Sequence, residues 1–317
     1  MTTVLAPGKI VLWGEYAVLA GAPAGVMALN TPARVSMRPS DDERWHFTSQ
    51  GFVTSPLACS SDTIPDGQAA GFVAAILTHW AHRSLAECGE AQSISTDSSA
   101  FFQAGQKLGL GSSASVCAAT YRLLCEVTRR PANYHEVMEI HRQWQGGKGS
   151  GLDVASVWHG GLIHFQDGDA KPAALPADLH WQIIFSGKSA GTADHIGSFD
   201  QWRKNANTSA LNELILASER LCTAPDLDSI ALYCHTLRRF DNAANLNIFT
   251  PEHIRLGTLA AASGVHYKPC GAGGGDIGIG FSDDPEALAL FRQQAEHNGF
   301  LPLDLEMASH GIALKHG

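Results

Sequence analysis

Apolar residues recur along this chain with two different periods, and each period predicts a different kind of element. Apolar side chains at helical spacing, with helix start and stop signals, predict helices at 71–82, 114–127, 133–145, 209–222, 228–242, 251–263 and 284–297. Short apolar runs and weaker alternation predict strands at 10–13, 27–37, 44–47 (as an edge), 92–102, 161–165, 181–185 and 277–281. One or two closing strands are expected within 301–314.

Two of these elements carry more detailed expectations. The first strand begins near Val4 and is interrupted by the breaker pair at 7–8 before it resumes at 10–13. In the helix at 133–145, Asn133 and the glutamate three residues later have the spacing of a capping box. Val137, Ile140 and Trp144 share one face of that helix, which we expect to be buried.

Length and composition narrow the class of protein. At 317 residues the chain exceeds most single domains, so we expect two domains that share a cleft, with a boundary between 170 and 180. A formal net charge of −9, without a basic stripe, argues against nucleic acid as the main partner. We expect a cytoplasmic protein with no membrane partner, because neither a signal-peptide pattern nor an apolar run of ~18 residues occurs. The seven scattered cysteines are expected as free thiols.

The stretch 107–115, Lys-Leu-Gly-Leu-Gly-Ser-Ser-Ala-Ser, is the strongest candidate for a ligand site. Gly109 and Gly111 allow a tight turn and a close approach of the backbone to a ligand, and a helix follows directly. The free N–H groups and dipole at such a helix start bind anions, and a serine there can also ligate magnesium. The alternative is an ordinary Gly-Ser loop that caps a buried helix.

Two charged residues lie in unusually apolar or glycine-rich surroundings. Asp153 follows the glycine-rich loop 146–151 and is flanked by small and apolar residues, where a carboxylate is costly unless a cation or ligand pairs with it. It could also serve as the N-cap of the next helix, and the two roles can coexist. Lys9 lies in an apolar segment punctuated by glycine and proline, which favours a place in a cleft over a solvent-facing one.

Two later segments add candidate contacts. The five residues 271–275 contain four glycines just before a strand, so the backbone must bend sharply and lie against something. The segment 186–192 offers hydroxyls and one cation, Lys188, to an anion. It is not a Walker A loop, because the first glycine of that motif would fall at Gln182.

Taken in order, these segments resemble the superfamily of galactokinase, homoserine kinase, mevalonate kinase and phosphomevalonate kinase. Residues 6–19 are similar to its first motif, 109–114 to its second and 271–275 to its third, so the resemblance runs from Ala6 to Phe281. It implies an α+β fold of two domains with the active site between them. The first, 1–175, would resemble domain 2 of ribosomal protein S5, and the second, 176–317, would be ferredoxin-like.

Within the superfamily, the phosphomevalonate kinases are the most similar. The segment 143–155, Gln-Trp-Gln-Gly-Gly-Lys-Gly-Ser-Gly-Leu-Asp-Val-Ala, resembles a motif of that family, and so do Lys107, 186–192 and 269–276. Mevalonate kinases generally carry a magnesium-binding glutamate about three turns before the catalytic aspartate. Here that position is near Arg142, with Glu139 one turn earlier, which counts against mevalonate kinase.

The resemblance implies a kinase of the mevalonate route to isoprenoids. It would use ATP and Mg²⁺ to phosphorylate 5-phosphomevalonate, giving ADP and 5-diphosphomevalonate. The acceptor phosphate is already largely ionised at neutral pH, so neutralising the charge of two polyanions is the larger problem. Alternatives are a sibling kinase that acts on an alcohol, such as mevalonate or a sugar, and a non-catalytic nucleotide-binding member. The oligomeric state and the adenine pocket stay open.

The same resemblance assigns roles to individual residues. Asp153 and Lys9 would be catalytic, with Lys9 between Asp153 and the reacting phosphates. The nucleotide would be bound by Lys107, Gly109, Leu110, Gly111, Ser112, Ser113 and Ala114, with Ser113 and Ser112 also on magnesium. The acceptor would be bound by Glu15, Arg142, Lys148, Ser150, Lys188, Gly271, Ala272, Gly273, Gly274 and Gly275.

Overall fold

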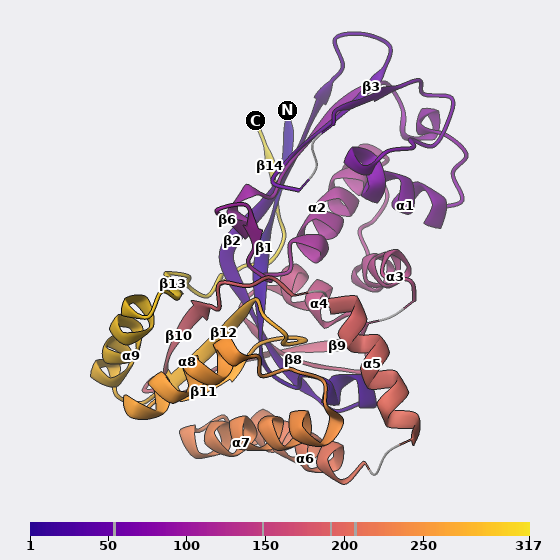
Figure 1. Ribbon diagram of the computed structural model, residues 1–317. Coiled ribbons are helices and arrows are strands. Elements are labelled where there is room, and N and C mark those ends of the chain that lie inside the picture. Colours follow the sequence, from indigo (N-terminus) through magenta and orange to yellow (C-terminus); the bar gives the residue numbers. More distant parts are fainter. Residues whose placement is uncertain (53–54, 148, 191, 206–207) are drawn as a thin grey trace.

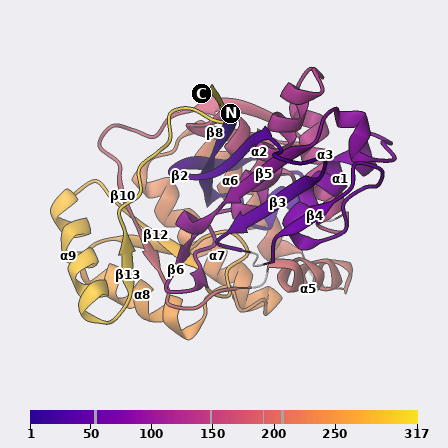
Figure 2. The ribbon, with the colours of Figure 1, turned by 90° about the horizontal axis from the view of Figure 1, so that it is seen from above.

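The protein has two lobes, each built from one main β-sheet with helices packed on it (Figure 1). The computed structural model describes residues 1–52, 55–147, 149–190, 192–205 and 208–317. Helices α1 and α3 lie at the opposite end of the molecule from α8 and α9, both in this view and from above (Figure 2). The α+β class and the two-domain architecture expected from the sequence are confirmed.

The N-terminal lobe is organised by a long antiparallel pair, β1 (Thr2–Trp13) and β2 (Ala24–Pro39). The strand order of its sheet is β14-β1-β2-β5-β3-β4, with β8 paired to β2 and β9 to β8. The remaining strands are β3 (Trp45–Gln50), β4 (Leu57–Cys59), β5 (Gln92–Asp97), β8 (Leu162–Gln166), β9 (Asp169–Ala173) and β14 (Ala313–His316). A hairpin of β6 (Phe102–Gln103) and β7 (Gln106–Lys107) leads into the glycine-serine loop.

One face of this sheet is covered by helices, among them α1 (Gly71–His79), α2 (Ser112–Val127), α3 (Tyr134–Trp144) and α4 (Leu152–His159). Helices α2 and α4 lie directly against β1 and β2. Asn133 caps α3 by accepting hydrogen bonds from the N–H groups of the second and third residues that follow it. The helices at the glycine-serine loop and after Asn133 therefore form as predicted, although their ends differ by a residue or two.

The C-terminal lobe has a sheet in the order β11-β12-β10-β13, formed by β10 (His180–Phe185), β11 (His266–Pro269), β12 (Ile277–Ser282) and β13 (Leu301–Leu303). Its helices are α5 (Thr192–Asn205), α6 (Ser209–Thr223), α7 (Leu227–Ala244), α8 (Pro251–Ala262) and α9 (Pro285–His297). Ile183 and Ile184 point to opposite faces of the sheet, because successive strand residues alternate. Ile183 packs in the core with α6 and α7, and Ile184 packs with α8 and α9.

Strand β1 belongs to the cores of both lobes. Val11 packs with the helices of the N-terminal lobe, whereas Ile10 and Leu12 pack with residues of α6 and α7. Alternation then places Lys9 on the same face of β1 as Val11, toward α2 and α4. The two lobes are thus joined by the apolar core on the Ile10 and Leu12 face of the strand that carries Lys9.

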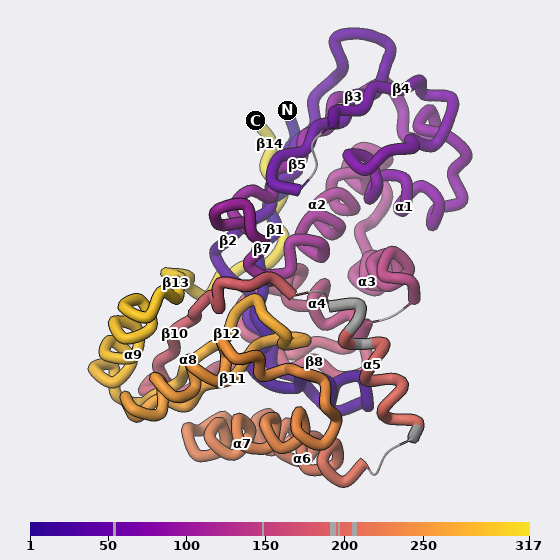
Figure 3. The backbone as a smooth tube through the Cα atoms, in the orientation of Figure 1, coloured from indigo at the N-terminus to yellow at the C-terminus, as the bar shows by residue number. Residues whose placement is uncertain are grey.

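The end of the chain returns to the N-terminal lobe. The tube in Figure 3 shows the last segment leaving the C-terminal lobe and running up beside the N-terminus. There β14 pairs antiparallel with β1, with Thr2 opposite His316. The expected division at 175/176 therefore does not describe the last residues, because their backbone hydrogen bonds are made with the first strand.

Other sequence expectations need correction. Strand β1 is continuous, because the break expected at 7–8 is absorbed by a register shift between Ala6 and Gly8 while pairing with β2 continues on both sides. The stretch expected as an edge strand, β3, lies between β4 and β5. Trp144 is 48% exposed rather than buried, and its ring lies against Phe72 with centroids 4.6 Å apart. The expectation for 92–102 was too long, because β5 ends at Asp97.

Among the residues that the structure describes, no helix combines the length and apolar character needed to cross a bilayer.

The contact between the C-terminal tail and α4 generates a stability prediction. A Cβ added at Gly311 would lie 2.0 Å from the carbonyl oxygen of Trp158, a backbone atom that cannot move aside cheaply. We expect Gly311→Ala to lower the free energy of unfolding by about 1–3 kcal/mol, measured by denaturant titration. The control is Gly257→Ala within α8, where the nearest atom lies 3.8 Å away and alanine favours the helix. Equal losses in both variants would contradict the prediction.

Candidate active site

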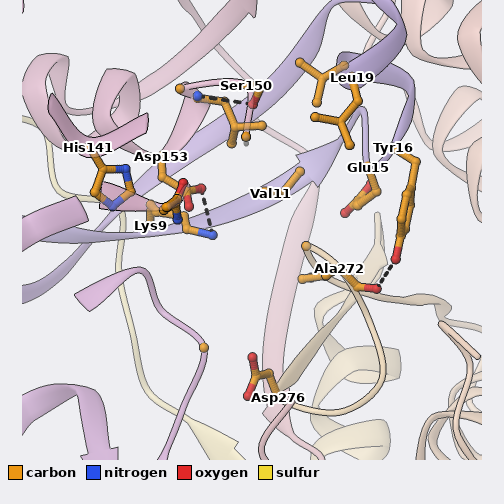
Figure 4. A pocket seen from close by; sticks show the side chains of 18 residues that line it. Lys9, Val11, Glu15, Tyr16, Leu19, His141, Ser150, Asp153, Ala272 and Asp276 are labelled. Atoms are coloured by element: carbon orange, nitrogen blue, oxygen red, sulfur yellow. Dashed lines mark hydrogen bonds and ion pairs between the residues drawn. The ribbon is translucent and has the colours of Figure 1, made fainter. Parts of the chain in front are cut away.

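A pocket lies between the lobes, and its lining comes from segments far apart in the chain (Figure 4). Strand β1 contributes Lys9 and Val11, the glycine-serine loop contributes Gly109, and the loop before α4 contributes Ser150. Across the pocket lie Cys270, Gly271, Ala272 and Asp276 from the third glycine segment. The three glycine-rich segments that the sequence singled out therefore converge with Lys9 and Asp153 on one crevice.

An ion pair forms the centre of the pocket. Lys9 Nζ lies 3.0 Å from Asp153 Oδ1, and the two side chains are 10% and 33% exposed. Asp153 lies in the first turn of α4, where its charge is favourably placed at the positive end of the helix dipole. Gly151 occupies the cap position in a left-handed conformation, so the alternative of Asp153 as the N-cap is wrong.

The glycine-serine loop wraps around the side chain of Lys9. The Lys9 N–H donates to the carbonyl of Leu110 (2.8 Å), and a Cβ added at Gly111 would lie 2.8 Å from the lysine side chain. Gly111 caps α2 with a φ of 83°, and no side chain caps that helix start. Its first-turn N–H groups are thus left for a ligand. The side chains of Leu110 and Ala114 are buried, so only their backbone can serve the loop.

His141 on α3 is a pocket residue that the sequence did not single out. Its Nε2 lies 3.0 Å from the hydroxyl of Ser113, and burial is the main cause that lowers the pKa of its imidazole below the usual value. The neutral ring can accept a hydrogen bond from the Ser113 hydroxyl, which leaves the serine oxygen lone pairs for a ligand. A histidine in the last turn of an amphipathic helix gives no signal in the sequence that separates it from a core residue.

Asp276 is another carboxylate of the pocket, and sequence reasoning gave it no role. Its Oδ1 accepts from the Ala190 N–H at 3.0 Å, and burial raises the pKa of its carboxyl. The side chain lies directly against the glycine-serine loop, since a Cβ added at Gly109 would fall 2.5 Å from its atoms. The third glycine segment therefore reaches across the cleft to support the loop of the other lobe.

Only part of the third glycine segment faces the pocket. Gly271 and Ala272 line it, and the Ala272 carbonyl accepts a hydrogen bond from the Tyr16 hydroxyl at 2.5 Å. The other glycines pack away from it, because added Cβ atoms at Gly273, Gly274 and Gly275 would meet Ile248, His195 and the Lys188 backbone. These three allow the tight bend rather than line the pocket.

The predicted acceptor contacts are divided between the pocket and its surroundings. Ser150 lines the pocket, and its hydroxyl accepts from the Leu152 N–H at 3.3 Å. Arg142 is not among the described lining residues. Its guanidinium donates to the carbonyls of Gly149 (3.4 Å) and Ser150 (3.3 Å), so it holds the turn before α4.

The structure describes one of the two other predicted cations. The Lys188 side chain is exposed and is not among the lining residues, although its carbonyl accepts from the Asp276 N–H at 2.6 Å. Lys148 lies outside the described residues. Among the described residues, Lys9 is therefore the one lysine or arginine that lines the pocket.

Glu15 lies in the wall of the pocket, with both carboxylate oxygens engaged. It forms an ion pair with Lys268 and accepts from the Tyr233 hydroxyl at 2.6 Å, and its side chain is fully buried. A substrate would have to displace one of these partners to reach the carboxylate. The sequence could not show this, because Tyr233 and Lys268 lie more than two hundred residues along the chain.

A second pocket opens on the other side of the start of α2. Lys107, Ser112 and Ser113 lie at its inner end, and Phe72 and Trp144 form an aromatic wall. The rest of its lining is Ser49, Phe52, Gln68, Ala69, Val73, Ile94, Thr96, Ser98, Val116 and Thr120. The glycine-serine loop thus separates an apolar pocket from the charged pocket that holds Lys9 and Asp153.

Comparison with known proteins shows what this arrangement is similar to. The family model described as "GHMP kinases N terminal domain" matches residues 75–161, which include the glycine-serine loop and Asp153. In this segment and in its listed relatives, the chain is similar to the GHMP kinases. The phosphomevalonate kinase of Streptomyces sp. (strain CL190) is 28% identical, with 97% of this chain and 97% of that protein covered.

Two further GHMP kinases extend the comparison. The mevalonate kinase of Homo sapiens is 26% identical, with 98% of this chain and 94% of that protein covered. The Streptococcus pneumoniae phosphomevalonate kinase, solved with phosphomevalonate and AMPPNP, superimposes with a TM-score of 0.78. It is 18% identical, with 97% of this chain and 100% of that chain covered, so the likeness is one of fold.

The affinity for nucleotide tests whether the contact between Asp276 and the glycine-serine loop matters for binding. We expect Gly109→Ala to weaken binding of a non-hydrolysable ATP analogue about tenfold, about 1.4 kcal/mol, because the new Cβ forces Asp276 and the loop apart. Titration calorimetry measures the loss.

Gly105→Ala is the matched control for Gly109→Ala. Both glycines have a φ of 79°, but nothing lies within 4 Å of an added Cβ at Gly105. The backbone strain is therefore the same in both variants, and only the clash with Asp276 differs. Equal weakening in the two variants would rule out a role for that contact.

Proposed function

We propose that this GHMP kinase transfers the γ-phosphoryl group of ATP to the phosphate of 5-phosphomevalonate and releases ADP and 5-diphosphomevalonate. The observation that carries the proposal is that the loop before the start of α2 and the start of α4 both line one pocket, together with the Lys9–Asp153 pair. Each start offers N–H groups to an anion, so the donor and a phosphorylated acceptor each have a binding element. The named phosphomevalonate kinase relatives support the same acceptor.

The donor nucleotide would lie across the start of α2. Its base would enter the second pocket beside Trp144, and its phosphates would follow Lys107 and the loop at 109–113 toward Lys9. An apolar, aromatic-walled pocket next to an anion-binding helix start fits a base joined to phosphates.

The hydroxyls of Ser112 and Ser113 fit a magnesium ion that arrives with the nucleotide. Among the described residues no group of three or more His, Cys, Asp or Glu is placed to hold a metal. This suits an ion held mainly by phosphate oxygens, since Mg²⁺ takes few protein ligands in nucleotide sites. Bound there, it would supply positive charge between the donor phosphates.

The chemistry then depends on charge more than on proton transfer. An oxygen of the acceptor phosphate attacks the γ-phosphorus of ATP, and the bond from that phosphorus to the bridging oxygen of ADP breaks. The attacking oxygen is already ionised, so little base catalysis is needed. The Lys9 ammonium neutralises charge on the reacting phosphates, and Asp153 holds it at the centre of the pocket.

A kinase that acts on an alcohol is the second candidate, and the human mevalonate kinase relative favours it. In that reaction Asp153 would accept the proton of the substrate hydroxyl instead of only orienting Lys9. Arg142 argues for a phosphorylated acceptor. It donates to the carbonyls of Gly149 and Ser150 and so holds the turn that leads into the anion-binding start of α4.

The acceptor can be identified by ADP release. We expect purified protein with MgATP to release ADP rapidly with 5-phosphomevalonate, and far more slowly with mevalonate, galactose or homoserine. Mass spectrometry should show a product heavier by one phosphoryl group. Turnover of mevalonate alone would replace this proposal with the second candidate, and binding of MgATP without turnover on the whole panel would indicate a non-catalytic member.

The role of Asp153 can be separated from binding. We expect Asp153→Asn to lower kcat by about a hundredfold, because Lys9 loses the charge that orients it, while nucleotide affinity changes little. Steady-state kinetics and titration with an ATP analogue measure the two effects. The control is Asp178→Asn, an exposed position before β10. An unchanged kcat in Asp153→Asn would remove this residue from the mechanism.

A further inference from the structure

We infer that Glu15, Tyr233 and Lys268 form a buried network that positions the strand of Lys9 against the third glycine segment, and that turnover depends on it. This inference rests on the proposed kinase function. It makes Glu15 a positioning residue, in place of the substrate contact that the sequence suggested. It also assigns a role to Tyr233 and Lys268, which lie outside the family motifs.

Lys268 bridges the two sides of the cleft with one ammonium group. The residue is 0% exposed, and its Nζ forms an ion pair with Glu15 and donates to the carbonyls of Val11 (3.3 Å) and Pro269 (3.0 Å). Val11 lines the pocket two residues after Lys9 on β1, and Pro269 directly precedes the pocket residues at 270–272. A single group thus fixes the separation between the lysine strand and the third glycine segment.

Tyr233 fixes the turn that follows β1. Its hydroxyl accepts from the N–H groups of Gly14 (2.8 Å) and Glu15 (3.0 Å) and donates to the Glu15 carboxylate (2.6 Å). The next residue, Tyr16, has a φ of 60°, a conformation that a bulky side chain adopts only when its surroundings enforce it. Tyr16 then donates to the Ala272 carbonyl, which makes a second link to the same glycine segment.

The energetics of burial favour a positioning role. A buried ion pair is costly to desolvate, and well-packed apolar residues in its place are often at least as stable. Stability alone therefore gives little reason to bury a lysine and a glutamate here. Geometry gives a better one, because these bonds link backbone segments of both lobes directly below the pocket.

The test compares two buried tyrosines with the same kind of hydrogen bonding. Tyr121 is also buried, donates to a glutamate, Glu136 (2.5 Å), and accepts from the backbone N–H of Asn133 (2.9 Å). It lines neither of the two pockets described above. Tyr233→Phe and Tyr121→Phe therefore remove the same hydroxyl from comparable surroundings, one at the cleft and one away from it.

We expect Tyr233→Phe to lower kcat by about tenfold to a hundredfold with little change in the KM for MgATP, because small misplacement of reacting groups slows transfer strongly. Tyr121→Phe should lower the melting temperature about as much as Tyr233→Phe does, but it should keep the wild-type kcat. Equal kcat values in these two variants would overturn the inference.

A second variant removes the charges instead of the hydroxyl. Lys268→Met alone would leave the Glu15 carboxylate buried without a cation and is expected to destabilise the fold. The double variant Glu15→Gln/Lys268→Met removes both charges and should fold, yet it should also turn over about tenfold or more slowly. A folded double variant with wild-type kcat would contradict the positioning role and leave only a contribution to stability.

Amide hydrogen exchange tests the network without turnover. We expect exchange in peptides that cover 9–16 and 266–276 to be faster in Tyr233→Phe than in wild type, and unchanged there in Tyr121→Phe. Turnover of the variants is measured with whichever acceptor the wild type uses. If wild type uses none of the panel, the proposed function fails while the exchange comparison still decides the inference, and unchanged exchange in Tyr233→Phe would overturn it.

Discussion

A lysine that is 8% exposed must keep its charge and its position for this cleft to act on phosphates. Three contacts do this for Lys9, and each comes from a different part of the chain. Asp153 at the start of α4 supplies the opposite charge, the Leu110 carbonyl holds the lysine backbone, and Gly111 leaves room for its side chain. The opposite charge of Asp153, 3.0 Å away, offsets part of the cost of burying the lysine ammonium. The two anion-binding helix starts are placed by the same contacts.

Strand β1 explains why the site lies where it does. Its residues alternate between two cores, so the strand cannot move without disturbing both lobes. Lys9 and Val11, on one face of the strand, line the pocket. Ile10 and Leu12, on the other face, pack with residues of the C-terminal lobe. The buried Lys268 ammonium adds a polar link from this strand to the opposite wall. The distance between β1 and the third glycine segment is therefore set mainly by this packing and by the hydrogen bonds of Lys268.

Local signals in the sequence predicted the parts of the site that depend on neighbouring residues. A glycine-serine loop before a helix, and a carboxylate after a run of glycines, are properties of a few adjacent positions, and the structure brings both to one pocket with Lys9. Contacts across long separations were not predictable in this way. Asp276 meets Gly109 only after both lobes have folded, and the role of Glu15 depends on Lys268 at the far end of the chain. Helical spacing places Trp144 on the apolar face of its helix, but it cannot show whether another element covers that end of the face. Trp144 is therefore exposed although its spacing predicts burial.

The distribution of charge around the pocket also limits how phosphates can bind. Within the described lining, Lys9 is matched by Asp153, and Lys268 below matches Glu15. Asp276 remains as a carboxylate that forms no ion pair with a lysine or arginine in that lining, and burial raises the pKa of its carboxyl. The side chains of this lining thus supply no surplus positive charge for two polyanions, and Lys107 at the second pocket adds a single cation. The dipoles and N–H groups at the starts of α2 and α4, together with a cation that accompanies the nucleotide, must supply the difference. This requirement explains why glycines, which expose the backbone, dominate the walls of the cleft while arginines and lysines do not.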